Sequence, residues 1–355
     1  MTKKEWLDIG LEKGIIDRED YEEVTFQEAF KRWFCMKMQT TKEATVDRIE
    51  CTYNRHYRQS ALNEKCISKI ADSDIIIFLT EICTTQYIST REYGRIWQII
   101  ENVLSYMRDI NIGGVPLHDW QKIKRNIPTE KLSKAKKKEK AINQSDIEYI
   151  LKQVIDNKIY FRKQSACLCV CMNFYLGLRI GELSALRFED FNFERGTIFV
   201  QRIESKYYKR DSEGNKISGM EYEVVDHTKT ECSTRYVPIT PEVKRIYELI
   251  YNHHKEQGYD SPYIAYDGNQ TILSRSLDRT IRKLIELCET MYFSSHGIRK
   301  TFATTLHFNN VPTRVISDIL GHSEMSTTER CYILNYEHHD DRYAQYISEA
   351  IHYTI

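Results

Sequence analysis

An apolar run that extends from Gln164 to Leu178 is the feature that most constrains how this chain folds. Its length and composition predict a buried helix over Gln164 to Tyr175. Cys167, Cys169 and Cys171 alternate inside the run, and we predict that they are buried as small hydrophobic residues. The chain must therefore build a hydrophobic core around this helix.

The apolar run ends in a tight turn that carries an arginine. The turn reads Gly177-Leu178-Arg179-Ile180-Gly181-Glu182-Leu183, and its two glycines permit a bend that larger side chains would hinder. Arg179 directly follows a segment predicted to be core, where an arginine needs an anionic partner. Two partners are open at this stage: Glu182, in a structural ion pair, or a phosphate group.

A second group of polar residues lies within a short helical segment further along the chain. His296 and Arg299 are three residues apart, so a helix places both on one face. His322 follows in Leu320-Gly321-His322, and Tyr332 lies ten residues beyond it. A guanidinium matches phosphate oxygens, an imidazole can transfer protons, and a tyrosine can attack phosphorus. The combination predicts phosphoryl transfer to a protein oxygen.

Strand-like alternation separates these two motifs. β-Branched and aromatic residues alternate over Thr197 to Ile203, Glu221 to Asp226 and Thr234 to Ile239, which predicts three antiparallel strands. We expect the polar stretch from Ser205 to Gly219 to be an extended loop. Lys229 is predicted at the tip of the second hairpin, a place where a lysine is most often a solvated charge.

With these motifs the chain resembles the tyrosine site-specific recombinases, also called phage-type integrases. That family combines an arginine in a Gly-Leu-Arg-x-Gly-Glu-Leu turn, a hairpin lysine, His-x-x-Arg, Leu-Gly-His and, nine or ten residues later, a tyrosine. Six residues of this chain fill these places in the same order: Arg179, Lys229, His296, Arg299, His322 and Tyr332. The resemblance covers roughly residues 24–340 and is densest over 177–332.

The resemblance implies how the site would hold a phosphate. A phosphodiester repels nucleophiles and gains charge on its non-bridging oxygens during attack, so fixed donors are needed there. Arg179 and Arg299 would be the bidentate clamps, and His322 would add a donor. Glu182 would support the site by holding Arg179 or His296 in place.

The resemblance also assigns the nucleophile and the proton transfers. Tyr332 would attack phosphorus, giving a 3′-phosphotyrosyl link and freeing a 5′-hydroxyl group. Lys229 would protonate that leaving oxygen, and His296 would assist proton transfer at the tyrosine. Among the chain's 24 tyrosines, only Tyr332 stands at the family's spacing from the preceding histidine, and Tyr336 is the alternate.

No cofactor is expected for this reaction. A phosphotyrosyl bond is a phosphodiester like the bond that it replaces, so its energy can be used to rejoin a different strand. The chain contains no Gly-x-x-x-x-Gly-Lys-Ser/Thr loop and no carboxylate cluster typical of a two-metal nuclease. Its ten cysteines include no Cys-x-x-Cys pair and no histidine at zinc-like spacing.

The chain length of 355 residues predicts two domains, because a single domain usually has roughly 100–200 residues. We expect a mainly α fold with a small antiparallel sheet. The predicted parts are a short N-terminal lead-in (1–23), a helical core-binding domain that binds DNA (24–126), a basic linker (127–141), a catalytic domain (142–340) and a C-terminal helix in protomer contacts (341–355).

Capping signals place the helices. Thr25-Phe26-Gln27-Glu28 and Ser89-Thr90-Arg91-Glu92 have the capping-box form, and Thr41 to Tyr57 and Asp74 to Gln86 are helical between them. The resemblance implies that these four helices grip one face of a duplex; an ordinary bundle with solvated charges is the alternative. Later helices are predicted to start at Ser145, at Thr240 with Pro241, at Ser274, at Ser294 or Ser295, and at Pro312.

Charge is balanced over the whole chain but not locally. The 51 basic and 51 acidic residues alone argue against a nucleic-acid binder. Residues 122–140, however, hold nine basic and two acidic residues, a local net charge of +7. Its later part, from Pro128 to Ala141, is a solvated linker in either case, and the resemblance adds phosphate contacts by Lys122, Lys124, Arg125, Lys134, Lys136, Lys137 and Lys138.

The sequence and the resemblance also predict the cellular location and the other partners. Without a signal peptide or an apolar run of about 18 residues, the chain is predicted to be cytoplasmic, with reduced thiols and no membrane contact. The resemblance implies double-stranded DNA as the substrate, a homo-tetramer on two duplexes, and accessory DNA-bending proteins. An apolar stripe from Tyr343 to Ile351 would pack either on its own catalytic domain or on a neighbouring protomer.

The predicted function is therefore that of a site-specific DNA recombinase, an integrase or excisionase of a phage or conjugative mobile element. DNA inversion and chromosome-dimer resolution are the alternatives within the same chemistry. A type IB topoisomerase-like enzyme, a non-catalytic DNA-binding protein and an unrelated helical regulator are the competing interpretations.

Overall fold

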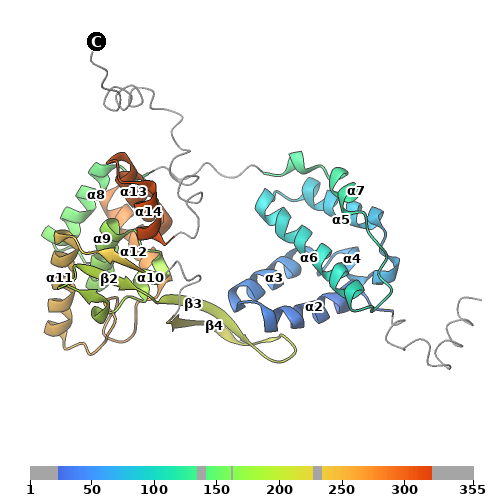
Figure 1. The fold of residues 1–355 in the computed structure, drawn as a ribbon, viewed down its shortest axis with the longest axis horizontal. Helices are drawn as coiled ribbons and strands as arrows, with labels where there is room; N and C mark the ends of the chain where they lie inside the picture. Colours follow the sequence, from blue (N-terminus) through green and yellow to red (C-terminus); the bar gives the residue numbers. More distant parts are fainter. Residues whose placement is uncertain (1–22, 134–140, 161–162, 227–233, 322–355) are drawn as a thin grey trace, which may run out of the picture. The chain divides into compact units, whose positions relative to one another are not determined.

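The computed structural model describes residues 23–133, 141–160, 163–226 and 234–321 (Figure 1). They form two compact units. One combines Met1–Lys138 with Lys206–Glu221, and the other combines Glu139–Ser205 with Tyr222–Ile355. The predicted domain boundaries stay predictions; the lead-in up to residue 22, linker residues 134–140 and the C-terminal helix 341–355 lie outside the described residues.

The first unit is helical. Thr25 caps α2 with the predicted capping box, since the Thr25 hydroxyl accepts from the Glu28 amide and the Glu28 carboxylate accepts from the Thr25 amide. The Ser89 hydroxyl likewise accepts a hydrogen bond from the amide of Glu92. The helices are α2 (Phe26–Thr40), α3 (Glu43–His56), α4 (Ala61–Glu64), α5 (Asp72–Thr85), α6 (Thr90–Asp109) and α7 (Trp120–Arg125).

A hairpin occupies the stretch that was predicted to be a loop, so that prediction is wrong. β3 (Ile203–Arg210) and β4 (Lys216–Val225) form a two-stranded sheet. Most of its side chains are partly or fully exposed, so no apolar alternation marks the strands. At the turn, the Asp211 carboxylate accepts hydrogen bonds from the amides of Glu213 and Asn215.

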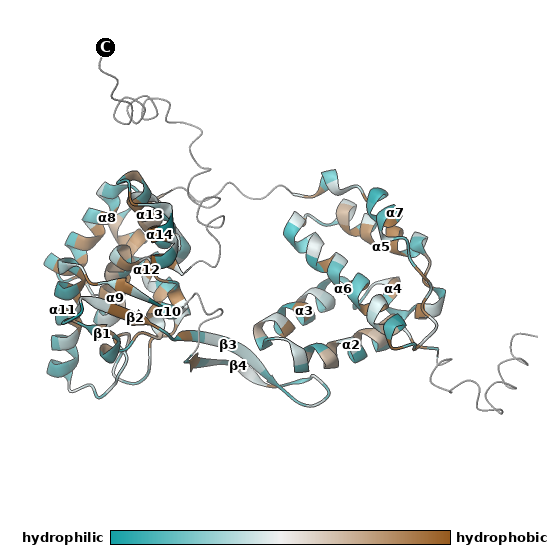
Figure 2. Ribbon diagram, in the orientation of Figure 1, coloured by the Kyte–Doolittle hydropathy of each residue, from teal (hydrophilic) through white to brown (hydrophobic). Residues whose placement is uncertain are grey.

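The second unit is built around α9 (Gln164–Leu176). Nearly every residue of this helix is buried, including Cys167, Cys169 and Cys171 at no more than 1% exposure, which confirms the prediction. Figure 2 shows hydrophobic residues gathered along α9. Packed around it are α8 (Gln144–Leu151), η4 (Lys152–Asp156), α11 (Pro241–Gln257), α12 (Ser274–Cys288) and α13 (Ser295–Phe308).

Local signals explain where several of these helices begin. The Thr240 hydroxyl accepts from the Val243 amide ahead of α11, and the Ser294 hydroxyl accepts from the Gly297 amide ahead of α13; both caps were predicted. The helix start predicted at Ser145 is one residue late, because α8 begins at Gln144 and Ser145 lies inside its first turn.

A small sheet completes the second unit. Its order is β1 (Phe191–Asn192), β2 (Thr197–Val200), β5 (Arg235–Pro238), with antiparallel pairs that align Val200 with Arg235. α10 (Ile180–Ser184) follows α9, and α14 (Thr313–Leu320) packs against β5. The mainly α fold with small antiparallel sheets is therefore confirmed. In the part of the chain that the structure describes, no helix is long and apolar enough to cross a membrane.

Candidate active site

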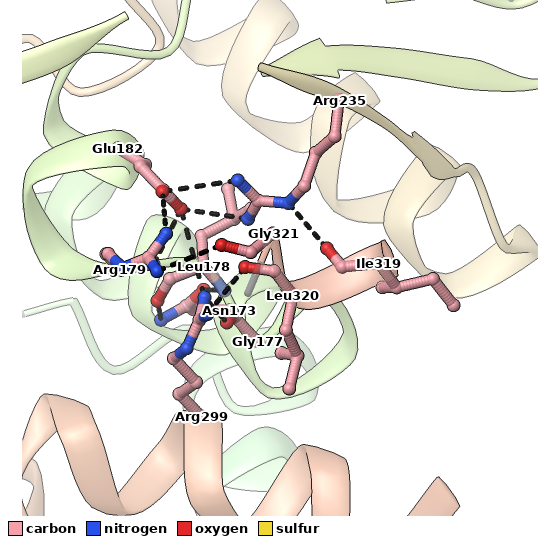
Figure 3. Close-up of polar contacts among 10 residues, drawn as sticks. All are labelled: Asn173, Gly177, Leu178, Arg179, Glu182, Arg235, Arg299, Ile319, Leu320 and Gly321. Carbon is pink, nitrogen blue, oxygen red and sulfur yellow. Dashed lines mark hydrogen bonds and ion pairs between the residues drawn. The ribbon is translucent and has the colours of Figure 1, made fainter. Parts of the chain in front are cut away.

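Three arginines converge on one buried carboxylate in the second unit (Figure 3). Glu182, whose side chain is 1% exposed, accepts a hydrogen bond of 2.8 Å from Arg179 Nη1. Arg235 donates to both carboxylate oxygens, with distances of 2.9 Å and 3.2 Å. Arg299 Nη1 lies 4.0 Å from the same carboxylate. A residue from α10, one from β5, one from α13 and one from the turn before α10 thus share a single site.

The turn after α9 positions Arg179. Gly177 ends α9 with φ of +59°, and a Cβ there would collide with the ring of Phe302, so glycine is required. The Asn173 side chain accepts from the Leu178 amide at 2.8 Å and donates to the Leu178 carbonyl at 3.2 Å. The Arg179 amide then donates to Glu182 Oε2 at 2.9 Å. These contacts therefore fix the backbone of Arg179 at the place where the chain leaves the core.

The same arginines hold the end of α14. Arg235 Nε donates to the Ile319 carbonyl, Arg299 Nη2 to that of Leu320, and Arg179 Nη2 to that of Gly321. The last carbonyls of a helix have no partner within the helix, and cationic side chains stabilise them. Three successive carbonyls are thus bound just before position 322.

Electrostatics favours an ionised carboxylate and a surplus of positive charge. Burial acts to raise the pKa of Glu182, but the charge and hydrogen bonds of Arg235, together with the charges of Arg179 and Arg299, outweigh it and hold that pKa below its usual value. Three guanidinium groups and one carboxylate give these four side chains a formal net charge of +2. An oxyanion suits such a site; a phosphodiester, with its single negative charge, would offset half of that charge.

The three arginines differ in exposure. The side chain of Arg179 is 36% exposed, whereas those of Arg235 and Arg299 are 5% and 3% exposed. Arg299 also donates to the Gly177 carbonyl at 3.0 Å. Arg179 is therefore the arginine of this cluster that a ligand in solution can reach, and the other two arginines shape its surroundings.

The structure brings together Arg179, Glu182 and Arg299 from the predicted site. His296 is exposed near the start of α13, the helix that carries Arg299. Lys229, His322 and Tyr332 lie outside the described residues, so their places stay predictions. Of the two partners considered for Arg179, the structure shows the ion pair with Glu182; a contact with a phosphate stays a prediction.

Sequence reasoning missed Arg235. A signal was present, because the predicted strand from Thr234 to Ile239 alternates and places Arg235 on the same face as Val237. Both are buried, whereas Tyr236 is exposed. An arginine at an inward position of a strand needs a buried partner, and Glu182 is that partner.

The predicted DNA contacts of the linker are only partly described. Lys122, Lys124 and Arg125 are exposed on α7, which is held in place by buried Ile123. Lys134, Lys136, Lys137 and Lys138 lie outside the described residues.

A second basic surface, which sequence reasoning also missed, lies in the first unit. A hollow of about 600 Å³ opens between α2, α3 and α6. Arg91, Arg95, Gln98 and Asn102 line it from one face of α6, and this three- and four-residue spacing was the available signal. The remaining lining residues are Trp33, Lys37, Thr41, Thr45, Arg48, Ile49, Thr52 and Ile99.

Comparisons with known proteins agree with this geometry. Residues 140–339 match the model of the phage integrase family. A protein named "Tyrosine recombinase XerC-like" from Caldanaerobacter subterraneus subsp. tengcongensis is 26% identical over 359 residues, which cover 93% of this chain and 83% of that protein.

Solved structures show the same fold. The Tn1549 transposon integrase in complex with a circular intermediate DNA has a TM-score of 0.69 at 15% identity, covering 92% of this chain and 99% of that one. The XerH site-specific recombinase bound to a palindromic difH substrate has a TM-score of 0.61 at 12% identity, covering 92% and 98%.

Proposed function

Because this chain belongs to the phage integrase family, we propose that it is a site-specific DNA recombinase that works through a 3′-phosphotyrosyl intermediate. The observation that carries the proposal is the cluster of Arg179, Arg235 and Arg299 around Glu182. Its formal charge of +2 and its single well-exposed arginine suit a ligand that is anionic and approaches from solvent, as a DNA phosphate does.

The proposed role of each arginine follows from where negative charge develops on the phosphate during cleavage. Attack on a phosphodiester increases the negative charge on its non-bridging oxygens, and preorganised donors stabilise that charge. Arg179 supplies a planar fork for two oxygens, and Glu182 prevents it from rotating away. Arg299, whose side chain is 3% exposed, adds positive potential. The role of second clamp predicted for it requires that DNA binding open the site to its guanidinium group, with His322 as a further donor.

The bonds change in two balanced steps. The Tyr332 oxygen forms a bond to phosphorus while the bond from phosphorus to the 5′ oxygen breaks, and that oxygen takes a proton from Lys229. His296 assists removal of the tyrosine proton. In the second step a 5′-hydroxyl oxygen of another strand forms a bond to phosphorus while the bond from phosphorus to the Tyr332 oxygen breaks. The hydroxyl proton returns to Lys229, and the tyrosine regains its proton with the help of His296. Neither step needs ATP or a metal, because one phosphodiester is exchanged for another.

Basic surfaces on the first unit support DNA as the partner. Lys122, Lys124 and Arg125 are exposed on α7, and the hollow between α2, α3 and α6 is lined by Arg48, Arg91 and Arg95 among other basic and polar side chains. Such side chains bind phosphates and base edges. The proposed assembly is a homo-tetramer on two duplexes, as the resemblance to the family implies.

Integration and excision of a mobile element is the biological role that we propose. The likeness to the Tn1549 transposon integrase supports it. Chromosome-dimer resolution is the second candidate, and the XerC-like relative favours it. The two differ in the DNA that is recombined, so duplexes that carry the repeats flanking the coding sequence distinguish a mobile element from a resolution site.

The direct test uses a nicked suicide duplex built from those flanking sequences. The short fragment released by cleavage diffuses away, so the protein stays attached to DNA on a denaturing gel. We expect an adduct from the wild-type protein and from Tyr336→Phe, and none from Tyr332→Phe, although all three bind the duplex. An undiminished adduct from Tyr332→Phe would move the nucleophile to another residue.

A second assay separates recombination from DNA relaxation. Two duplexes incubated with the wild-type protein are expected to form a four-way junction, because a recombinase joins strands of different molecules. Relaxation of supercoiled DNA without any junction would instead indicate a topoisomerase-like enzyme.

A further inference from the structure

We infer that Arg235 is a positioning residue for strand cleavage, an inference that rests on the proposed recombinase function. Its side chain is 5% exposed, so it is placed to act on the other cleavage residues and not on the DNA itself. It binds Glu182 on one side and the Ile319 carbonyl on the other. In this way it fixes both the accessible arginine and the end of α14.

The strand dictates that Arg235 points inward. β5 buries alternate residues, Arg235 and Val237, and pairs Arg235 with Val200 of β2. A buried guanidinium is costly unless its charge is paired and its N–H groups have partners. A role in folding alone would be met by any carboxylate in reach. Here the carboxylate is the one that also holds Arg179.

The first link runs through Glu182 to Arg179. Glu182 Oε1 accepts from both Arg235 Nη1 and Arg179 Nη1, at 3.2 Å and 2.8 Å. Arg235 also donates to the other oxygen at 2.9 Å, so the carboxylate is bound at both oxygens and its rotation is restricted. Without Arg235, we expect the carboxylate to turn and Arg179 to lose its fixed orientation.

The second link runs through α14. Arg235, Arg299 and Arg179 bind the carbonyls of Ile319, Leu320 and Gly321, one arginine for each. The end of the helix is thereby held to the same three guanidinium groups that carry the positive charge. The Arg235 bond to the Ile319 carbonyl therefore ties the last turn of α14 to the cluster.

The test compares buried arginines with and without a link to the cluster. Arg235→Met removes the charge and keeps an apolar stem of similar length. Arg202→Met is the matched control, because Arg202 is 11% exposed and pairs with Asp190 at 2.6 Å and Glu189 at 2.7 Å, outside the cluster. Each variant is assayed for urea unfolding, for the Kd of an intact duplex and for single-turnover cleavage of the nicked suicide duplex.

We expect Arg235→Met to bind DNA within about threefold of the wild-type protein and to cleave it at least about tenfold more slowly, a loss on the scale of one displaced donor. Arg235→Lys keeps the charge but not the fork, so we expect partial recovery. Arg202→Met should lose stability yet cleave normally.

A double variant tests the link through Arg179. In an Arg179→Ala background, adding Arg235→Met should slow cleavage much less than it does alone, because both substitutions act through one guanidinium group.

Three results would overturn the inference or the function on which it rests. Normal cleavage by Arg235→Met overturns the inference, and so does an equal loss of cleavage in Arg202→Met, which would mean that only stability matters. If Arg235→Met does not fold, the decision passes to Arg235→Lys, whose normal cleavage at normal stability would also overturn it. Failure of the wild-type protein to cleave the duplex would instead refute the proposed function.

Discussion

Two clusters in which arginine meets carboxylate, one in each unit, differ in charge balance. In the first unit Arg210 binds Asp47 and Glu50, and Lys216 adds a second contact to Glu50 at 2.9 Å. Two positive and two negative groups cancel. In the second unit three arginines share Glu182 and leave a formal charge of +2. A balanced cluster needs no ligand, whereas an unbalanced one is suited to hold an anion.

The balanced cluster fixes the hairpin segment of the first unit on its helices. Arg210 also donates to the Gly214 carbonyl at 2.9 Å and lies over the ring of Phe34 at 5.4 Å. The Tyr208 amide donates to Asp47 at 3.3 Å. Every charge in this contact has an opposite partner, so its role is to anchor β3 to α3. The cluster around Glu182, in contrast, keeps a net positive charge that a ligand can use.

The largest effect is expected from removing the carboxylate of the unbalanced cluster. Glu182→Gln removes the negative charge that three guanidinium groups share, and breaking a buried pair in this way costs about 3–5 kcal/mol of unfolding free energy. Urea unfolding measures the loss. Glu189→Gln is the control, because Glu189 also pairs with arginines but is 59% exposed, and it should change stability by less than about 1 kcal/mol. Equal losses of unfolding free energy in both variants would show that Glu182 contributes no more to stability than an exposed carboxylate does.

A smaller effect is expected at the balanced cluster. Arg210→Met leaves Asp47 and Glu50 with only Lys216 as a cation, and we expect a loss of about 1–3 kcal/mol, the scale of leaving charged groups unsatisfied. Adding Asp47→Asn should recover part of the loss, because it restores the charge balance. The rate of covalent adduct formation on bound DNA should stay close to that of the wild-type protein. A loss of cleavage as large as that of Arg179→Ala would show that this cluster is more than an anchor.

The smallest effect is expected from acid. Burial acts to raise the pKa of Glu50, but hydrogen bonds and charges of Arg210 and Lys216 outweigh it, so the pKa of Glu50, like that of Glu182, is lowered from 4.5. A lowered folded-state pKa gives stability that is present above the unfolded-state pKa and is lost as the pH falls through the folded-state value. Unfolding free energy measured from about pH 6 downward should therefore fall less steeply in Glu50→Gln and Glu182→Gln than in the wild-type protein. Unchanged slopes would mean that neither carboxylate depends on its arginines.

Local signals made much of the fold predictable, and long-range contacts account for what was missed. Thr25, Thr240 and Ser294 begin helices through bonds to residues three positions away, which sequence spacing reveals. Ser205 to Gly219 was predicted as a loop and not as the larger part of a hairpin, because Arg210 finds Asp47 and Glu50 at separations of 163 and 160 residues, and no local pattern shows such partners.

The same distinction holds within the candidate site. Arg179 and Glu182 are three residues apart and were predicted together. Arg235 lies 53 residues from Glu182, so only its inward position in a strand hinted at a role. Lys229, His322 and Tyr332 were predicted by motif order and stay predictions, since they lie outside the described residues.

One measurement directly tests the claim that the positive charge around Glu182 acts on a DNA phosphate. Single-turnover cleavage is compared for the wild-type protein and Arg179→Ala on two suicide duplexes, one with an ordinary phosphate at the cleaved position and one with a neutral methylphosphonate. On the ordinary phosphate we expect Arg179→Ala to be slower by on the order of 10²-fold. On the neutral group the difference should shrink to less than about tenfold, because the attacked group carries one negative charge fewer throughout the reaction. The same 10²-fold defect on both duplexes would mean that Arg179 serves only as the structural partner of Glu182, and it would contradict this account.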